Sequence, residues 1–219
     1  MTRIHTFAGG DLGENGYLVE LDDSGFGVVI DPGAAAPSMV RHIQEKGLSL
    51  AAILLTHAHL DHVEGLPHLR DHFPDAPIYL HPDDDRLYQG VDAQARAFNL
   101  PLVGPLPPTD RPLVHGEVLA FQGVEVQVRH APGHAPGHVI FILAREEAAF
   151  VGDVIFRGAI GRADLMGGDF HQLMGSIREQ VLTLPDQTTL FTGHGPETTV
   201  GWERKTNPFL VGHFGGDLA

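Results

Sequence analysis

Residues 51–62 read Ala-Ala-Ile-Leu-Leu-Thr-His-Ala-His-Leu-Asp-His. The apolar run 51–55 is typical of a buried strand, and it stops abruptly at residue types that bind metals. Imidazole suits zinc, iron and related ions, and a carboxylate can bind or bridge them. Because His57 and His59 are two residues apart, an extended loop can turn both rings to one side. The stretch predicts a buried strand ending at a metal site. The alternative is a surface loop in a chain with 15 histidines among 219 residues.

Strands and helices alternate around this stretch, which predicts an α/β architecture. In this half of the chain we expect strands at 3–7, 15–21, 27–30, 51–55 and 77–80, and helices at 37–46, 63–73 and, in two pieces, 82–99. Five prolines between residues 100 and 112 predict an irregular surface loop.

The second half repeats the combination of a short apolar strand and a residue that can bind a metal. We expect strands within 113–129 and at 139–143, 148–151 and 188–192, helices at 169–181 and 198–213, and a glycine-rich loop at 156–168. His134 follows the strand near 124–129, Asp153 follows 148–151, and His194 follows 188–191. Together with His57 after 51–55, this recurrence predicts that the strand ends converge on one metal site.

Composition limits the classes of function. The formal charge of −14 argues against nucleic acid as a partner, because phosphate binding needs a basic surface. The absence of cysteine excludes thiolate ligands, so histidines and carboxylates must hold any metal. The N-terminal residues lack the apolar core of a signal peptide, and no apolar run reaches the length of a membrane span. We therefore expect a single cytoplasmic domain over residues 1–219 that does not associate with membranes; the oligomeric state stays open.

Two residues outside the main motif are candidates for supporting a metal site. Asp31 ends a strand in Asp-Pro-Gly, so it serves either as a turn residue or as an acceptor that orients a metal-bound histidine. His138, four residues after His134, is either such a supporting residue or a buried structural histidine. We interpret His130 as structural.

Several motifs together resemble the metallo-β-lactamase superfamily, and within it the short glyoxalase II-like (hydroxyacylglutathione hydrolase-like) enzymes. The matching pieces are Thr-His-Ala-His-Leu-Asp-His at 56–62, Pro-Gly-His at 132–134, Gly-Asp at 152–153, Gly-Arg-Ala-Asp-Leu at 161–165, Gly-His-Gly-Pro at 193–196 and the tail 198–209. They cover nearly the whole chain in order. The resemblance implies a four-layer αββα sandwich with the site at one edge, between two sheets.

The resemblance also implies a ligand set for two metal ions. His57, His59 and His134 would hold the first ion, Asp61, His62 and His194 the second, and Asp153 would bridge them. Zinc is the expected metal, although iron and manganese accept the same ligands. A hydroxide between the ions would attack a thioester carbonyl, and the expected thioester is an S-2-hydroxyacyl-thiol. Asp61 would orient the proton of that hydroxide and pass it to the leaving group.

The thiol half of the substrate is less defined. Longer glyoxalase II enzymes carry a C-terminal helical domain that helps bind glutathione. This chain ends 25 residues after His194, so we expect that domain to be missing. By resemblance, Arg162 is the best remaining group for a substrate carboxylate. An ion pair between Arg162 and Asp164 is the alternative.

This prediction has alternatives in other classes of protein. The main rival resemblance is to persulfide dioxygenases, which hold one iron through residues corresponding to His57, His134 and Asp153. The Gly-His-Gly-Pro motif at 193–196 favours the binuclear hydrolase. Metallo-β-lactamases usually carry cysteine or serine in place of Asp153. A non-enzymatic metal-binding scaffold is a further alternative. The complete ligand set counts against it, because a purely structural site has no need of an open position for water.

Overall fold

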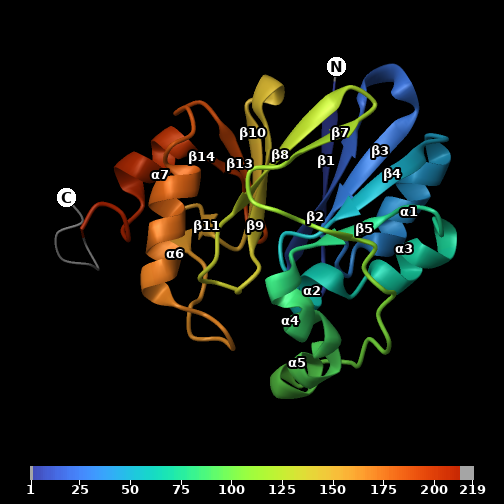
Figure 1. Ribbon diagram of the computed structural model, residues 1–219, viewed down its shortest axis with the longest axis horizontal. Helices are drawn as coiled ribbons and strands as arrows, with labels where there is room; N and C mark the ends of the chain where they lie inside the picture. Colours follow the sequence, from blue (N-terminus) through green and yellow to red (C-terminus); the bar gives the residue numbers. More distant parts are fainter. Residues whose placement is uncertain (1, 213–219) are drawn as a thin grey trace. The chain divides into compact units, whose positions relative to one another are not determined.

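The computed structural model describes residues 2–212 (Figure 1). They fall into two compact units. The first contains the residues up to Leu113 together with Ala120–Val124, and the second contains Val114–Leu119 together with the residues from Glu125 onward. The single domain expected over residues 1–219 stays a prediction.

A mixed sheet forms the centre of the first unit. Its strands, in spatial order, are β1 (Arg3–Gly9), β2 (Glu14–Glu20), β3 (Phe26–Ile30), β4 (Ser49–Leu54), β5 (Ile78–Leu80) and β6 (Arg111–Pro112). Neighbours from β1 to β3 pair antiparallel, and neighbours from β3 to β6 pair parallel. Because parallel strands end at the same edge of a sheet, Asp31 after β3 and His57 after β4 emerge close together.

The first unit also contains several short helices. They are a 3₁₀ turn at Asp22–Ser24, α1 (Ala36–Glu45), α2 (Leu60–Val63), α3 (Leu66–His72), a 3₁₀ turn at Pro82–Asp84, α4 (Asp85–Gln89) and α5 (Val91–Phe98). In α1 the apolar residues Met39, Val40 and Ile43 are buried. A Cβ atom on Gly16 of β2 would lie 2.2 Å from Cε of Met39, so α1 packs directly on that strand.

The helix expected at 63–73 is two helices. α2 already begins at Leu60, and the helix is interrupted at Gly65 before α3 begins. Gly65 donates its N–H to the Pro32 carbonyl at 2.8 Å, and a Cβ there would lie 2.3 Å from the Gly33 carbonyl oxygen. Helical periodicity alone does not reveal this break, because its cause is close contact with the turn after β3.

The proline-rich segment is irregular as predicted, except at its end. Arg111 and Pro112 form the short strand β6, which pairs with Tyr79 and Leu80 of β5. Proline lacks a backbone N–H, and an edge strand tolerates this loss because one side needs no partner.

The second unit is built on most of another mixed sheet. Its strands, in spatial order, are β14 (Thr198–Thr199), β13 (Thr189–Thr192), β10 (Ala148–Gly152), β9 (Val139–Leu143), β8 (Val124–His130) and β7 (Val118–Phe121). β10 and β13 are parallel, while β9 pairs antiparallel with both β8 and β10. Hence β8, β10 and β13 all run in one direction and end at the same edge of the sheet.

Helices and a hairpin complete the second unit. They are a 3₁₀ turn at Ala144–Glu146, the hairpin of β11 (Ile155–Phe156) and β12 (Ala159–Ile160), α6 (Phe170–Ser176) with a π-helical continuation at Ile177–Val181, and α7 (Val200–Thr206). Leu173 and Ile177 of this helical segment and Val200 of α7 pack on Ile140 and Val151 of the sheet. Residue 213, the last of the expected helix 198–213, lies outside the described residues. No helix within residues 2–212 has both the length and the apolar character to cross a bilayer.

Candidate metal centre

A buried hydrogen-bond network begins where β3 and β4 end. The Thr56 N–H donates to Oδ1 of Asp31 at 2.7 Å, and the Thr56 hydroxyl donates to Oδ2 at 2.6 Å. Oδ2 also lies 3.0 Å from Nδ1 of His62. Asp31 has a φ of +48°, a conformation that aspartate tolerates better than most residues. Asp31 therefore both turns the chain and contacts His62, and its role in orienting a metal-bound histidine stays a prediction.

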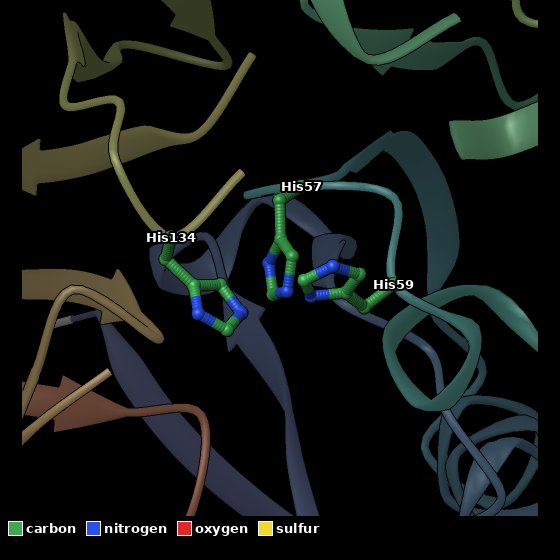
Figure 2. A group of neighbouring side chains, drawn as sticks. All are labelled: His57, His59 and His134. Atoms are coloured by element: carbon green, nitrogen blue, oxygen red, sulfur yellow. The ribbon is translucent and has the colours of Figure 1, made fainter. Parts of the chain in front are cut away.

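His57, His59, Asp61 and His62, here called the loop cluster, follow β4 within one short segment. The three histidines are buried, and the Asp61 side chain is 13% exposed. The ring centroids of His57 and His59 lie 4.7 Å apart with nearly perpendicular planes, and Figure 2 shows these two rings side by side. The His62 ring lies 4.1 Å from that of His57. The first unit thus brings together all four of its predicted metal ligands.

Two residues that sequence reasoning missed support the backbone of the loop cluster. Asp84 is fully buried, and its Oδ2 accepts the Ala58 N–H at 2.9 Å. Gln94 of α5 accepts the Leu60 N–H at 3.0 Å and donates to the Ala58 carbonyl at 3.0 Å. Neither residue belongs to a motif or a periodic pattern that marks it in the sequence.

Glu14 is a further buried acid beside the loop cluster. Only 1% of it is exposed, and its Oε1 lies 4.0 Å from Nδ1 of His62. A Cβ on Gly33 would lie 2.2 Å from Oε2 of Glu14 and 2.2 Å from the Asp61 carbonyl oxygen. Gly33 is therefore required for this close approach of β2 and the loop cluster.

A small cavity of about 150 Å³ lies beside Asp61, inside the first unit. Three of its lining residues are acidic, namely Asp11, Asp61 and Glu64. Burial, followed by the charges of Asp61 and Asp11, raises the pKa of Glu64. The acidic lining of this cavity therefore disfavours additional negative charge.

The second unit gathers His134, Asp153 and His194, here called the strand-end cluster. Each residue follows one of the three strands that end at the same edge, β8, β10 and β13. Oδ2 of Asp153 lies 3.4 Å from Nε2 of His134 and 3.5 Å from Nε2 of His194. One carboxylate oxygen thus faces two imidazole nitrogens. Figure 2 labels His134, which comes from the loop after β8.

Backbone contacts determine the orientation of His134. Its Nδ1 lies 2.7 Å from the carbonyl oxygen of Arg162, so Nδ1 carries the proton and donates. Nε2, which faces Asp153, is then the nitrogen with the lone pair. Gly161 makes this approach sterically feasible, because a Cβ there would lie 1.8 Å from the Asp153 carbonyl oxygen and 3.2 Å from Nδ1 of His134.

His130, at the end of β8, and His138, in the loop that follows, both contact the backbone. Nε2 of the fully buried His138 accepts the Asp153 N–H at 3.1 Å, so His138 positions the residue that faces both histidines. Nε2 of His130 lies 2.8 Å from the Pro136 carbonyl oxygen, consistent with its structural interpretation.

The Arg162 side chain points to a partner of its own. Nε and Nη2 donate to the two carboxylate oxygens of Asp164 at 2.9 and 3.1 Å. This pairing raises the pKa of Arg162 and lowers that of Asp164. The ion pair considered as the alternative is therefore present, and a contact of Arg162 with substrate stays a prediction.

The donor sets fit divalent metal ions. Asp31, His57 and His62 each place one possible ligand atom within 4.8 Å of the others. Both clusters offer only imidazole nitrogens and carboxylate oxygens, which suit zinc, iron and manganese.

The model of the metallo-β-lactamase superfamily matches residues 9–194, which include both clusters. The chain belongs to this superfamily. Hydroxyacylglutathione hydrolase GloC of Haemophilus influenzae, a relative within the superfamily, is 40% identical over 189 residues, covering 86% of this chain and 89% of the relative.

Two solved structures of the superfamily resemble the chain over most of its length. The structure of TTHA1623 in a di-iron-bound form has a TM-score of 0.84 and 45% identity, covering 94% of this chain and 100% of that one. The structure of BLEG-1, a B3 metallo-β-lactamase, has a TM-score of 0.89 and 35% identity, covering 96% and 100%. These matches confirm the predicted α/β fold class, the metallo-β-lactamase fold.

Proposed function

We propose that this chain is a binuclear metal-dependent hydrolase that cleaves a thioester, specifically an S-2-hydroxyacyl-thiol. The observation that carries the binuclear part is the Asp153 carboxylate, whose Oδ2 lies within 3.5 Å of Nε2 of both His134 and His194. A carboxylate that faces two imidazoles in this way suits a bridge between two ions, each bound by one of these histidines.

Every residue of the two clusters would have a role. The first ion would be held by His57, His59 and His134, the second by Asp61, His62 and His194, with Asp153 shared. Asp31 would act on the second ion through His62, because its carboxylate accepts the Nδ1 proton and leaves Nε2 for the metal. His138 would act on both ions, because it holds the backbone of Asp153 in place.

Bound divalent ions supply a water that ionises near neutral pH and a Lewis acid for the thioester carbonyl. The chain itself supplies the proton transfer and the positioning. We assign proton transfer to Asp61, whose partly exposed carboxylate lies 3.9 Å from Nε2 of His62. It would orient the proton of the attacking water and deliver it to the leaving sulfur. A thiol pKa of about 8–9 makes that sulfur a good leaving group.

The name of a relative and the charge of the site support the proposed substrate class. A relative that is 40% identical is named a hydroxyacylglutathione hydrolase, which supports a small-molecule hydroxyacyl thioester. The acidic lining of the cavity beside Asp61 suits an uncharged hydroxyacyl group better than a carboxylate. If Arg162 binds a carboxylate of the thiol, it must first leave Asp164, and both side chains are exposed enough to move.

Zinc remains our proposed metal, with iron and manganese as alternatives. The N/O donor set accepts all three, and metal availability decides between them. The di-iron-bound relative shows that a similar chain holds iron.

The first test is the number of metals per chain, measured by elemental analysis together with hydrolysis of S-D-lactoylglutathione. We expect two ions per chain and thioester turnover. One iron per chain, with oxygen uptake on a persulfide, would establish the dioxygenase instead. A β-lactam belongs in the same assay, since preferential β-lactam hydrolysis would replace the thioester proposal.

The second test uses substitutions in the strand-end cluster. His134→Ala and Asp153→Ala should abolish turnover and lower the metal content, while the fold largely survives. His171→Ala is the matched control, because His171 is exposed on α6 of the same unit. Full activity in either cluster variant would exclude the assigned site.

A further inference from the structure

A second group of metal-binding side chains lies at the far end of the first sheet. His5 on β1, Glu20 on β2 and His42 on α1 each place one ligand atom within 4.8 Å of the others. β2 runs from Glu14, beside the loop cluster, to Glu20. Six residues of extended strand at about 3.4 Å each separate the two ends by about 20 Å. This group is therefore distinct from the loop cluster.

The fold brings these three residues together through sheet register and helix packing. Arg3 pairs with Glu20 across the β1–β2 ladder, so His5, two residues further along, is a diagonal neighbour of Glu20 on the same face. α1 covers that face, and His42 lies in its last turn. The ring centroids of His5 and His42 are 4.6 Å apart.

The ligand atoms converge on one carboxylate oxygen. Nε2 of His5 lies 2.8 Å and Nε2 of His42 lies 3.2 Å from Oε1 of Glu20. Metal–ligand bonds of about 2.0–2.1 Å in a tetrahedral site separate neighbouring ligand atoms by about 3.3 Å. Arg3 contacts the other oxygen, Oε2, at 3.4 Å, which leaves Oε1 to the two histidines.

Hydrogen bonding accounts for only part of this arrangement. Nε2 of His5 is a buried atom, and within residues 2–212 it has no hydrogen-bond partner of acceptable geometry despite its closeness to Oε1. Its neighbour His42 does reach Glu20 with a hydrogen bond. A buried imidazole nitrogen that faces an anionic oxygen without a satisfactory hydrogen bond is well placed to bind a cation instead.

Charge and access also favour a cation. The Glu20 side chain is 7% exposed, and burial raises its pKa. The hydrogen bond with His42, the charge of His5 and the hydrogen bond from Arg3 together outweigh this effect and lower the pKa, so the group is an anion at neutral pH. The side chains of His5 and His42 are 30% and 25% exposed, which gives an ion a path from solvent and leaves room for water as a fourth ligand.

We propose that His5, Glu20 and His42 form a second, peripheral metal site that binds one borderline divalent ion such as Zn²⁺ and ties β1 and β2 to α1. Two imidazoles and one carboxylate select this class over Mg²⁺ and Ca²⁺, which prefer all-oxygen ligands. An ion that binds only the folded chain stabilises it by mass action.

The test compares zinc stoichiometry between matched variants by equilibrium dialysis at neutral pH. His5→Gln, His42→Gln and the double variant each remove an imidazole from a partly exposed position. His72→Gln, at an exposed histidine of α3, is the control. We expect wild type and His72→Gln to bind one zinc more per chain than the double variant. Because this is a difference, it does not depend on how many ions the loop and strand-end clusters hold, or on whether the chain hydrolyses thioesters.

Thermal unfolding provides an independent readout. Added Zn²⁺ should raise the Tm of wild type and His72→Gln by several degrees more than that of the double variant, and Mg²⁺ should have no such effect. Equal zinc stoichiometry in all five proteins would overturn the proposal. So would a double variant that is less stable than wild type to the same extent with and without Zn²⁺, since the three residues would then form ion pairs only.

Discussion

The loop cluster and the strand-end cluster offer similar ligands but are built differently. The loop cluster comes from six consecutive residues, and its positions depend on polar side chains from other elements. These are the buried Asp31, Glu14 and Asp84 and the half-buried Gln94. The strand-end cluster comes from three residues spread over sixty positions, and the parallel directions of β8, β10 and β13 bring them together.

This difference predicts which kind of substitution should disturb each cluster. A contiguous loop has no scaffold of its own, so the loss of one buried acceptor should disturb several ligands together. Residues at strand ends are positioned by the backbone of a sheet, so they should be most sensitive to steric changes in the segments that cross the edge. The following substitutions separate these two kinds of sensitivity.

The largest effect should come from Gly161→Ala in the strand-end cluster. The new Cβ would lie 1.8 Å from the Asp153 carbonyl oxygen, so the backbone beside Asp153 and His134 must move. Displacements of about 1 Å cost about 100-fold in rate, and overpacking costs about 1–3 kcal/mol of stability. Turnover assays and urea unfolding measure the two effects. Gly175→Ala in α6 is the control, because a Cβ there meets nothing within 4 Å. Identical behaviour of the two variants would refute a steric role for Gly161.

Asp31→Asn should have the next largest effect, on the loop cluster. Asparagine also tolerates the positive φ, so the substitution removes the charge and one acceptor without straining the turn. Losing these buried hydrogen bonds should cost about 1.5–3 kcal/mol. Metal affinity should fall by about 10–100-fold, because His62 loses its orienting acceptor. Urea unfolding and metal titration provide the measurements, with Asp75→Asn at an exposed position as the control. Unchanged metal affinity would show that the loop cluster does not depend on Asp31.

His138→Ala should have a smaller effect, again on the strand-end cluster. The Asp153 N–H would lose its acceptor, at a cost of about 1–3 kcal/mol. His138→Gln should recover part of this loss, because an amide oxygen can accept the same hydrogen bond. Unfolding free energies and metal content of the two variants provide the measurement. Equal losses in both would mean that packing, rather than the hydrogen bond, is the contribution of His138.

Tyr88→Phe should have the smallest effect at neutral pH. Tyr88 belongs to α4, which begins directly after Asp84, and its hydroxyl donates to the Pro107 carbonyl at 2.7 Å. Losing this bond should cost about 1 kcal/mol, with turnover retained. Burial raises the pKa of Tyr88, so the unfolded chain loses this proton first, near pH 10. The unfolded state then binds fewer protons, and wild-type stability should fall above about pH 10. Urea unfolding at pH 7 and above pH 10 should show a shallower fall for Tyr88→Phe. Equal slopes would contradict this assignment.

The sequence by itself was enough to predict the superfamily, the α/β class and the strands that precede each proposed ligand. These features are local, because apolar runs of strand length and the residues directly after them can be read from neighbouring positions. The loop cluster is the clearest case, since its four residues fall within six positions of the chain and α2 contains two of them, Asp61 and His62.

Only the tertiary structure showed what holds these residues in place. Asp84 and Gln94 support the loop cluster from 26 and 34 residues away, and the break at Gly65 results from contact with the turn after β3. The same holds for the grouping of His5, Glu20 and His42, which depends on strand register and on the packing of α1. Contacts between distant segments leave no periodic pattern in the sequence, because each depends on where two separate elements meet. The chain order therefore identified the proposed ligands, and the packing of the elements revealed which other side chains orient them.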